Sequence, residues 1–132
     1  MKWIEVKMRE LGVTRHTDYK IAFFLDSNAM ITVDIEQHGN KRVKPLGVIW
    51  GKLPQYYNPS NTIMFDDVKR NFLMNPQNGL TIEPFRQWYK NRETDRELYY
   101  LAKYLKIIAD YPDLSILNHR SWKKLLKRYN EI

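Results

Sequence analysis

The sequence of 132 residues contains no cysteine, and no apolar run in it approaches the length of a membrane span. The lack of cysteine excludes a disulfide framework and any metal site built on thiolates. The lack of a long apolar run predicts no transmembrane helix, and no charged-then-apolar secretory leader opens the sequence. We therefore expect an intracellular protein without membrane contact, in the cytoplasm or the nucleus.

Histidine and glycine are also scarce, with three and five residues respectively. His16, His38 and His119 are scattered, with no carboxylate or cysteine at ligand spacing. The sequence therefore supports neither a zinc site nor a nucleophilic triad based on histidine. It also lacks a glycine-rich loop that would cradle a phosphate.

What the chain does contain is enough apolar and aromatic side chain for one core. Hydrophobic residues make up 43% of the sequence, and its length suits a single domain over residues 1–132. The formal net charge of +7 favours an anionic partner such as nucleic acid, a membrane surface, an acidic protein or a phosphoprotein. A solubilising surface charge explains the same value equally well.

Apolar periodicity predicts a mixture of strands and helices. In chain order we expect a helix over residues 1–11, a buried strand over 19–25, an exposed hairpin over 31–44, short strands at 62–65 and 80–82, and helices over 98–109 and 118–129. The segment Thr94-Asp95-Arg96-Glu97 has the pattern of a capping box before the longer C-terminal helix. The apolar stripe of that helix is expected to be Leu98, Leu101, Ala102, Leu105, Ile108 and Ala109.

Two adjacent carboxylates, Asp66 and Asp67, follow the short apolar run at residues 62–65. An acid pair where a buried strand ends lies at the carboxyl edge of a sheet, where open α/β folds bind ligands. Carboxylate oxygens on rigid backbone are the donors that Mg²⁺ requires. Spacing alone favours a simpler interpretation, in which the pair ends the strand and caps the following helix.

Lys44 is held in place by its neighbour Pro45, which keeps the preceding residue extended and begins the next short helix. The lysine therefore lies at a fixed strand-to-helix junction. Without wider context it is one more surface lysine.

Two longer sequence segments supply that context. The segments F-D-D-V-K-R-N-F-L-M-N-P-Q-N-G-L (65–80) and V-K-P-L-G-V-I-W (43–50) closely resemble the CTD-phosphatase branch of the haloacid dehalogenase (HAD) superfamily. The resemblance also covers the opening M-K-W-I-E-V-K-M-R-E-L-G-V and N-H-R-S-W near the C-terminus. It implies a partial HAD-like Rossmannoid α/β fold, with a parallel sheet, a β-hairpin insertion and C-terminal helices.

The same resemblance assigns roles to three residues. Lys44 would be the catalytic lysine that neutralises phosphate charge, as a fixed ammonium does near developing negative charge. Asp67 would bind Mg²⁺ directly. Asp66, counted with Lys44 among the catalytic residues, would be its neighbour, either a weaker ligand of the ion or a residue just outside the direct ligands. The implied activity is Mg²⁺-dependent hydrolysis of phosphoserine or phosphothreonine through an aspartyl-phosphate intermediate. The implied substrates are proteins such as the RNA polymerase II tail or the proteasome, in the nucleus.

One required motif is absent. Enzymes of this superfamily attack phosphate with the first aspartate of a D-x-D-x-T motif, and the sequences D-S-N, D-R-E and D-Y-P at residues 26, 95 and 110 do not qualify. We expect the chain alone to be inactive and its sheet to lack the central strand. A rearranged sheet, a dimer or a partner carrying the first half would complete it.

A second function class remains open. The net charge, the missing nucleophile and the basic last helix fit a non-catalytic interaction module that binds an acidic protein or nucleic acid. Of these two, nucleic acid is the less favoured partner, because the aromatic and basic residues at 85–92 have the spacing of core plus solvated charge.

Overall fold

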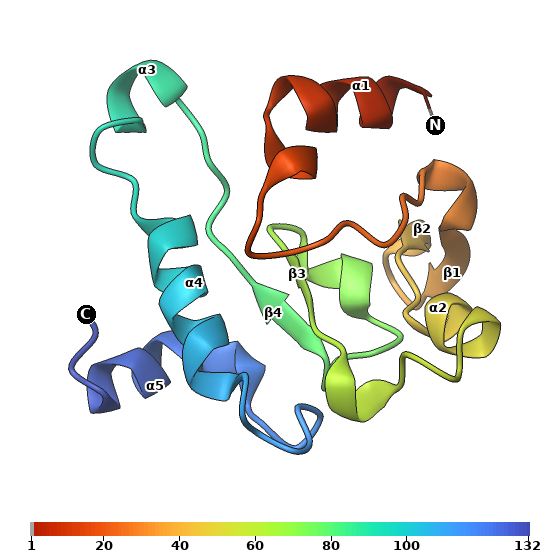
Figure 1. Cartoon of the computed structure of the whole chain (residues 1–132). Coiled ribbons are helices and arrows are strands. Elements are labelled where there is room, and N and C mark those ends of the chain that lie inside the picture. Colours follow the sequence, from red (N-terminus) through yellow and green to blue (C-terminus); the bar gives the residue numbers. More distant parts are fainter. Residues whose placement is uncertain (1) are drawn as a thin grey trace. The chain divides into compact units, whose positions relative to one another are not determined.

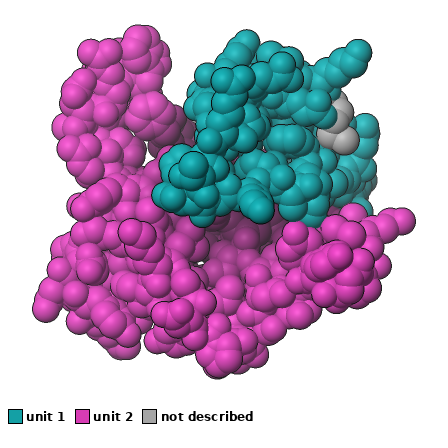
Figure 2. Space-filling model, in the orientation of Figure 1, with its two compact units in different colours: residues 1–42 teal, residues 43–132 magenta. Residues whose placement is uncertain are grey.

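The computed structural model describes residues 2–132 and divides the chain into two compact units, residues up to Arg42 and residues from Val43 to Ile132 (Figure 2). Among the described residues, no helix is both long enough and apolar enough to cross a membrane.

The first unit begins with a helix and ends with a hairpin (Figure 1). Helix α1 spans Lys2–Glu10 and stops at Gly12, whose φ of 76° is left-handed and suits glycine. Strands β1 (Ile31–Ile35) and β2 (Gly39–Val43) form a two-stranded sheet, and the last residue of β2 belongs to the second unit. The predicted N-terminal helix is confirmed over Lys2–Glu10, with Met1 of the predicted range outside the described residues, and the predicted hairpin is confirmed.

The strand predicted at residues 19–25 is wrong. The chain has no regular secondary structure from residue 19 to residue 26, and the side chains of Ile21 and Leu25 are 38% and 48% exposed. A strand is stable only when a neighbour completes its hydrogen-bond ladder. Each of the two sheets that the structure describes has only two strands, and neither takes up this segment.

The second unit contains a parallel strand pair and the remaining helices. Its elements are α2 (Gly47–Lys52), β3 (Met64–Asp66), a 3₁₀ helix at Lys69–Phe72, β4 (Gly79–Thr81), α3 (Trp88–Asn91), α4 (Glu97–Ile108), a 3₁₀ helix at His119–Ser121 and α5 (Trp122–Arg128). Strand β3 pairs with β4 in parallel, with Met64 opposite Gly79 and Asp66 opposite Thr81. Mixed α/β architecture with a small parallel sheet and a hairpin is the partial fold that the sequence predicts.

Strand β4 begins at a glycine that the packing requires. Gly79 is buried, and a Cβ atom built on it would overlap the ring of Phe72, which is itself buried. The ring belongs to the 3₁₀ helix that connects the two strands. A side chain at this position must therefore displace either that helix or β4.

We expect Gly79→Ala to lower the free energy of unfolding by about 1–3 kcal/mol, the usual cost of overpacking a core. Gly47→Ala is the matched control, because a Cβ on Gly47 meets no atom within 4 Å. Urea unfolding of both variants measures the difference. Equal stability of the two variants would contradict the packing described for Phe72.

Helices α4 and α5 close the core over strand β4. The buried cluster consists of Leu80, Leu101, Tyr104, Ile108, Trp122 and Leu126. The Trp122 indole N–H also donates to the Thr81 carbonyl at 3.1 Å, which ties α5 to β4. The predicted stripe of α4 is partly wrong, because Leu98 and Ala102 are exposed and the aromatic ring of Tyr104 takes the inner face.

The predicted capping box before α4 is also wrong. The N–H of Glu97 is capped by Asp95 Oδ1 at 3.0 Å, and not through Thr94. The Glu97 side chain instead accepts the N–H of Glu83 at 2.9 Å and pairs with Lys123 of α5 at 2.6 Å. A buried carboxylate with two such donors fastens the start of α4 to the segment after β4 and to α5.

A polar pair is buried within the core. His119 Nε2 lies 2.7 Å from the Leu114 carbonyl, and its Nδ1 lies 2.6 Å from Tyr104 Oη. A carbonyl only accepts, so Nε2 carries the proton and Nδ1 accepts the tyrosine hydroxyl. Burial lowers the pKa of His119 below its usual 6.5 and outweighs the opposing effect of the Leu114 carbonyl. Burial also raises the pKa of Tyr104 to about 12.

We expect stability to fall as the pH drops below about 6.5. The folded pKa of His119 is depressed, so the unfolded chain binds a proton there that the folded chain does not. Urea midpoints between about pH 7.5 and about pH 5.5 measure the loss, and an NMR titration of the imidazole assigns it. The control His38→Gln, at an exposed position, should keep the same pH dependence. A midpoint that rises on acidification would show that His119 is not the titrating group.

Candidate functional site

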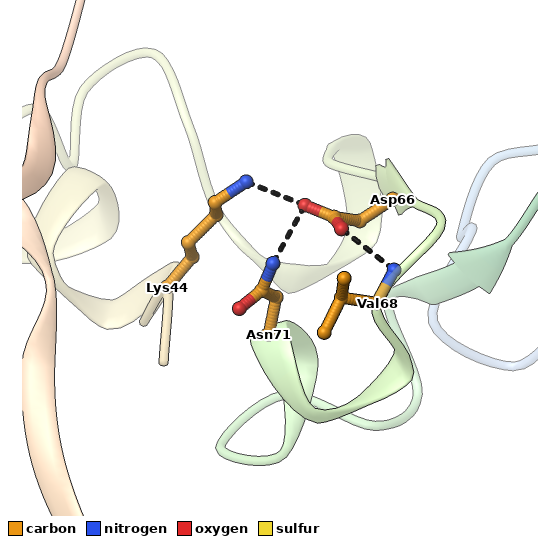
Figure 3. A network of polar contacts seen from close by, with 4 residues as sticks. All are labelled: Lys44, Asp66, Val68 and Asn71. Atoms are coloured by element: carbon orange, nitrogen blue, oxygen red, sulfur yellow. Dashed lines mark hydrogen bonds and ion pairs between the residues drawn. The ribbon is translucent and has the colours of Figure 1, made fainter. Parts of the chain in front are cut away.

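The candidate site forms where the end of β2 meets the loop after β3 (Figure 3). Lys44 directly follows β2, and its N–H donates to the Asn71 carbonyl at 2.8 Å. Two residues further on, the N–H of Leu46 donates to Asn75 Oδ1 at 2.8 Å. These bonds fix the backbone on both sides of Pro45, so Lys44 lies at the fixed junction predicted from the sequence.

The Asp66 carboxylate is the centre of the site. It forms an ion pair with Lys44 Nζ through Oδ2, which also accepts the Asn71 side-chain amide at 2.9 Å. Its Oδ1 accepts the N–H of Val68 at 2.8 Å (Figure 3). The structure thus brings together two of the three predicted site residues, Lys44 and Asp66.

These contacts keep the Asp66 carboxylate ionised. Burial raises the pKa of Asp66, but hydrogen bonds from Lys44, Val68 and Asn71 oppose it, and the net pKa lies below 3.8. The carboxylate is only 9% exposed, whereas the lysine side chain is 49% exposed. The ammonium group is therefore held by a nearly buried carboxylate, while about half of the lysine side chain is exposed to solvent.

Asp67 lies apart from this network. It is exposed, and it lines a pocket of about 410 Å³ together with residues that follow β4 and residues at the start of α4. Asp67 lies in the bend directly after β3, and within residues 2–132 its side chain makes no hydrogen bond or ion pair, whereas the Asp66 carboxylate is bound by Lys44. The structure therefore separates the two aspartates that the sequence places side by side.

The residues present fit only part of a magnesium site. Across residues 2–132, no group of three or more histidine, cysteine, aspartate or glutamate side chains lies close enough to hold a metal ion. Asp66 already accepts three hydrogen bonds, so Asp67 is the aspartate of the pair whose oxygens have no partner within the described residues 2–132. One carboxylate supplies only part of the octahedral shell of oxygen ligands that Mg²⁺ requires.

A network that positions a lysine beside a carboxylate after a parallel strand is consistent with the family to which the sequence points. The chain belongs to the NLI interacting factor-like phosphatase family, whose sequence model matches residues 3–115. The matched range contains Lys44, Asp66 and Asp67.

The proteins with similar sequences are named as CTD phosphatases. The chain is 60% identical over 128 residues to ubiquitin-like domain-containing CTD phosphatase 1 of Danio rerio and 57% identical over 128 residues to the Homo sapiens protein of that name. Each alignment covers 97% of this chain and 40% of the relative. The Arabidopsis thaliana ubiquitin-like domain-containing CTD phosphatase is 57% identical over 123 residues, which is 93% of this chain and 36% of that protein. The resemblance to CTD phosphatases is confirmed, and the chain spans less than half the length of these curated relatives.

Asn71 is the site residue that the sequence interpretation missed. It is 7% exposed, its backbone carbonyl accepts Lys44 N–H and its side chain donates to Asp66. It thus contacts both members of the ion pair. The sequence signal that could have identified Asn71 is its position as a polar residue on the inner side of the short helical turn after the acid pair.

Proposed function

We propose that this chain is the C-terminal part of a HAD-type, Mg²⁺-dependent protein phosphatase that acts on phosphoserine or phosphothreonine. The nucleophilic aspartate would come from a D-x-D-x-T segment elsewhere in a longer gene product. The names of the relatives support a phosphoprotein substrate of the CTD type, and the RNA polymerase II tail in the nucleus is the substrate we propose. The proteasome is the second candidate from the same resemblance.

The observation that carries this proposal is the Lys44–Asp66–Asn71 network. An ammonium group at a fixed position stabilises negative charge without having to reorganise when the charge appears. Asp66 and the Asn71 carbonyl hold the lysine from opposite ends, by its ammonium group and by its backbone N–H. A substrate phosphate that meets the exposed part of the lysine would be neutralised there.

We assign Asp67 to Mg²⁺ and Asp66 to the lysine. When bound, Mg²⁺ would neutralise phosphate oxygens as a Lewis acid. Asp67 supports this assignment because its carboxylate is free within the described part of the chain and directly follows the network. Asp66 would act on the lysine alone.

A non-catalytic basic module that binds an acidic protein is the second candidate. The observation that favours it is the absence of a D-x-D-x-T motif from the 132 residues, together with the net charge of +7. Phosphatase assays on the longest product of the gene separate the two. Mg²⁺-dependent release of phosphate from a phosphoserine peptide supports the enzyme. A product that binds acidic peptides and releases no phosphate supports the module.

Magnesium titrations test the unequal roles of the two aspartates. We expect the isolated chain to give little heat with Mg²⁺ in calorimetry, because one or two carboxylates cannot complete the ion's shell. In the longer product, Asp67→Asn should raise the Mg²⁺ concentration needed for activity more than Asp66→Asn does. Tight binding by the isolated chain that both substitutions abolish equally would refute the assignment.

A further inference from the structure

Three basic side chains of the last helical segment follow one another along one face of it. Arg120 lies in the 3₁₀ helix at His119–Ser121, and Lys124 and Arg128 follow in α5, each four residues after the one before. Residues four apart on a helix are neighbours on its surface. All three side chains are exposed. The basic last helix noted in the sequence thus presents a row of cations to solvent.

This row borders two adjoining pockets. The larger has a volume of about 350 Å³ and is lined by Lys124 and Arg128, and the smaller has a volume of about 230 Å³ and is lined by Arg120. Leu117 and Asn118 line both, so the two pockets adjoin and together form what we call the α5 groove. Among the residues that the structure describes, no aspartate or glutamate lines either pocket.

The positive charge of the α5 groove is not cancelled within the chain. The side chains of Arg120, Lys124 and Arg128 make no hydrogen bond or ion pair within residues 2–132. Lys123 differs, because it pairs with Glu97 at 2.6 Å and so joins α5 to α4. The three cations of the groove are therefore available to a partner.

The α5 groove also has an apolar lining that is continuous with the core. Leu117 and Leu125 are half-buried and pack against the buried cluster. The segment before α5 is fixed, because His119 Nε2 donates to the Leu114 carbonyl at 2.7 Å and the Leu114 N–H donates to the Ser60 carbonyl at 2.7 Å. The groove is thus preformed, and a ligand would bind it without first having to order a loop.

We infer that the α5 groove binds an acidic peptide segment of a partner protein, with an apolar residue among its carboxylates. The carboxylates pair with the row of cations, and the apolar side chain lies against Leu117 and Leu125. Residues two apart in an extended peptide lie on the same side, about 6–7 Å from each other. The rise between Lys124 and Arg128 is about 6 Å. Two carboxylates of one extended peptide therefore match the spacing of these two cations.

Nucleic acid fits the α5 groove less well. Proteins that bind single strands without reading their sequence stack the bases on aromatic side chains. The aromatic rings that line the two pockets, Tyr104 and His119, are only 1% and 2% exposed and cannot stack on a base. The aromatic segment at 85–92, which the sequence predicts as core, is exposed instead, with Phe85 and Trp88 at 57% and 62%, but it lines neither pocket.

This inference goes beyond the proposed phosphatase function, because the α5 groove includes neither Lys44 nor the two adjacent aspartates. It holds whether or not the longer gene product hydrolyses phosphate. Peptide binding is measured without catalysis, so failure of the inference and failure of the phosphatase proposal are distinguishable.

The test is fluorescence anisotropy with the 132-residue chain and a labelled peptide of four glutamates around one leucine. We expect this peptide to bind, and its affinity to fall as salt screens the charges. Lys124→Glu and Arg128→Glu should each weaken binding at least about fivefold, the upper range for one exposed ion pair. Replacing the leucine of the peptide by serine should weaken binding about tenfold, because the apolar contact is lost.

Lys127→Glu is the matched control. It makes the same charge change at an exposed position of α5 that lines neither pocket, and it should keep most of the affinity. Circular dichroism checks that each variant is folded, and NMR shifts of the amides at 117–125 locate the bound peptide.

Three results would overturn the inference. The first is no binding of the acidic peptide by the folded chain. The second is an equal loss of affinity in Lys127→Glu and Arg128→Glu, which would show attraction to the net charge alone. The third is displacement of the peptide by a thymidine oligonucleotide that binds more tightly, which would assign the α5 groove to nucleic acid.

Discussion

The isolated chain of 132 residues is expected to release no measurable phosphate from an aryl phosphate, with or without Mg²⁺. Covalent phosphoryl transfer needs a nucleophilic carboxylate, and the chain contains no D-x-D-x-T motif to supply one. Charge stabilisation by Lys44 cannot replace a group that forms the bond. The measurement is a phosphate-release assay on pure protein at high enzyme concentration.

Complementation provides the positive control for that assay. Adding a separately expressed segment of a relative that carries D-x-D-x-T should restore turnover, provided that the two pieces associate. Turnover by the chain alone that Lys44→Ala removes would show that another of its residues attacks phosphate. The D-x-D-x-T segment would then be unnecessary.

Replacement of Lys44 by methionine in the longest gene product should lower kcat by about 10²–10³-fold, the usual effect of removing one preorganised charge-stabilising donor. Methionine keeps the length of the side chain and removes its charge. Lys52→Met, at an exposed position of α2, is the matched control and should leave kcat unchanged. Arginine at position 44 should restore only part of the rate, because a planar guanidinium differs in shape from an ammonium.

The same variant makes a second, independent prediction about pH. Lys44 is one of the groups that lower the pKa of Asp66, so Lys44→Met should raise that pKa. Because the folded pKa of Asp66 is depressed, its contribution to stability is present above about pH 3.8 and is lost as the pH falls through the folded value. The variant should therefore lose stability at neutral pH and show a weaker dependence on pH in the acid range. Unchanged acid unfolding would contradict the ion pair.

Local signals in the sequence were sufficient for elements that need no distant neighbour. The spacing of Ile4 and Met8 predicted α1, and the alternation of Ile31, Val33 and Ile35 predicted β1. Both patterns are complete within a few residues. The apolar run at residues 19–25 looked equally strong, but a strand depends on a partner that composition cannot reveal.

The prediction of the inner face of α4 was partly wrong for a related reason. Periodicity assigned Leu98 to the core, whereas Leu98 is exposed and the neighbouring Glu97 is buried, bound to the N–H of Glu83 after β4 and to Lys123 of α5. Tyr104 is absent from the predicted stripe, yet it is buried because His119 supplies the acceptor that its hydroxyl needs. Tertiary partners decided both positions.

The residues of the candidate site were predicted from the resemblance, but the end of the strand that positions them was not. Lys44 and Asp66 came from the resemblance, and the structure places them together. Strand β3 ends at Asp66, one residue beyond the predicted strand, and Asp67 lies in the bend that follows. A shift of one residue in a strand decides which way a side chain points, and no spacing rule gives it.

Asn78 has a consequence for the chemical ageing of the protein. Its amide donates both hydrogens, to the Pro59 carbonyl at 2.6 Å and to the Thr62 carbonyl at 2.7 Å, and the side chain is 3% exposed. It is followed by Gly79, and asparagine is among the thermolabile residues. Deamidation would replace the donor nitrogen by an oxygen and turn two attractions into two repulsions at the entrance to β3. Because the amide is held in place only while the chain is folded, each unfolding event exposes this bond to a change that refolding cannot reverse.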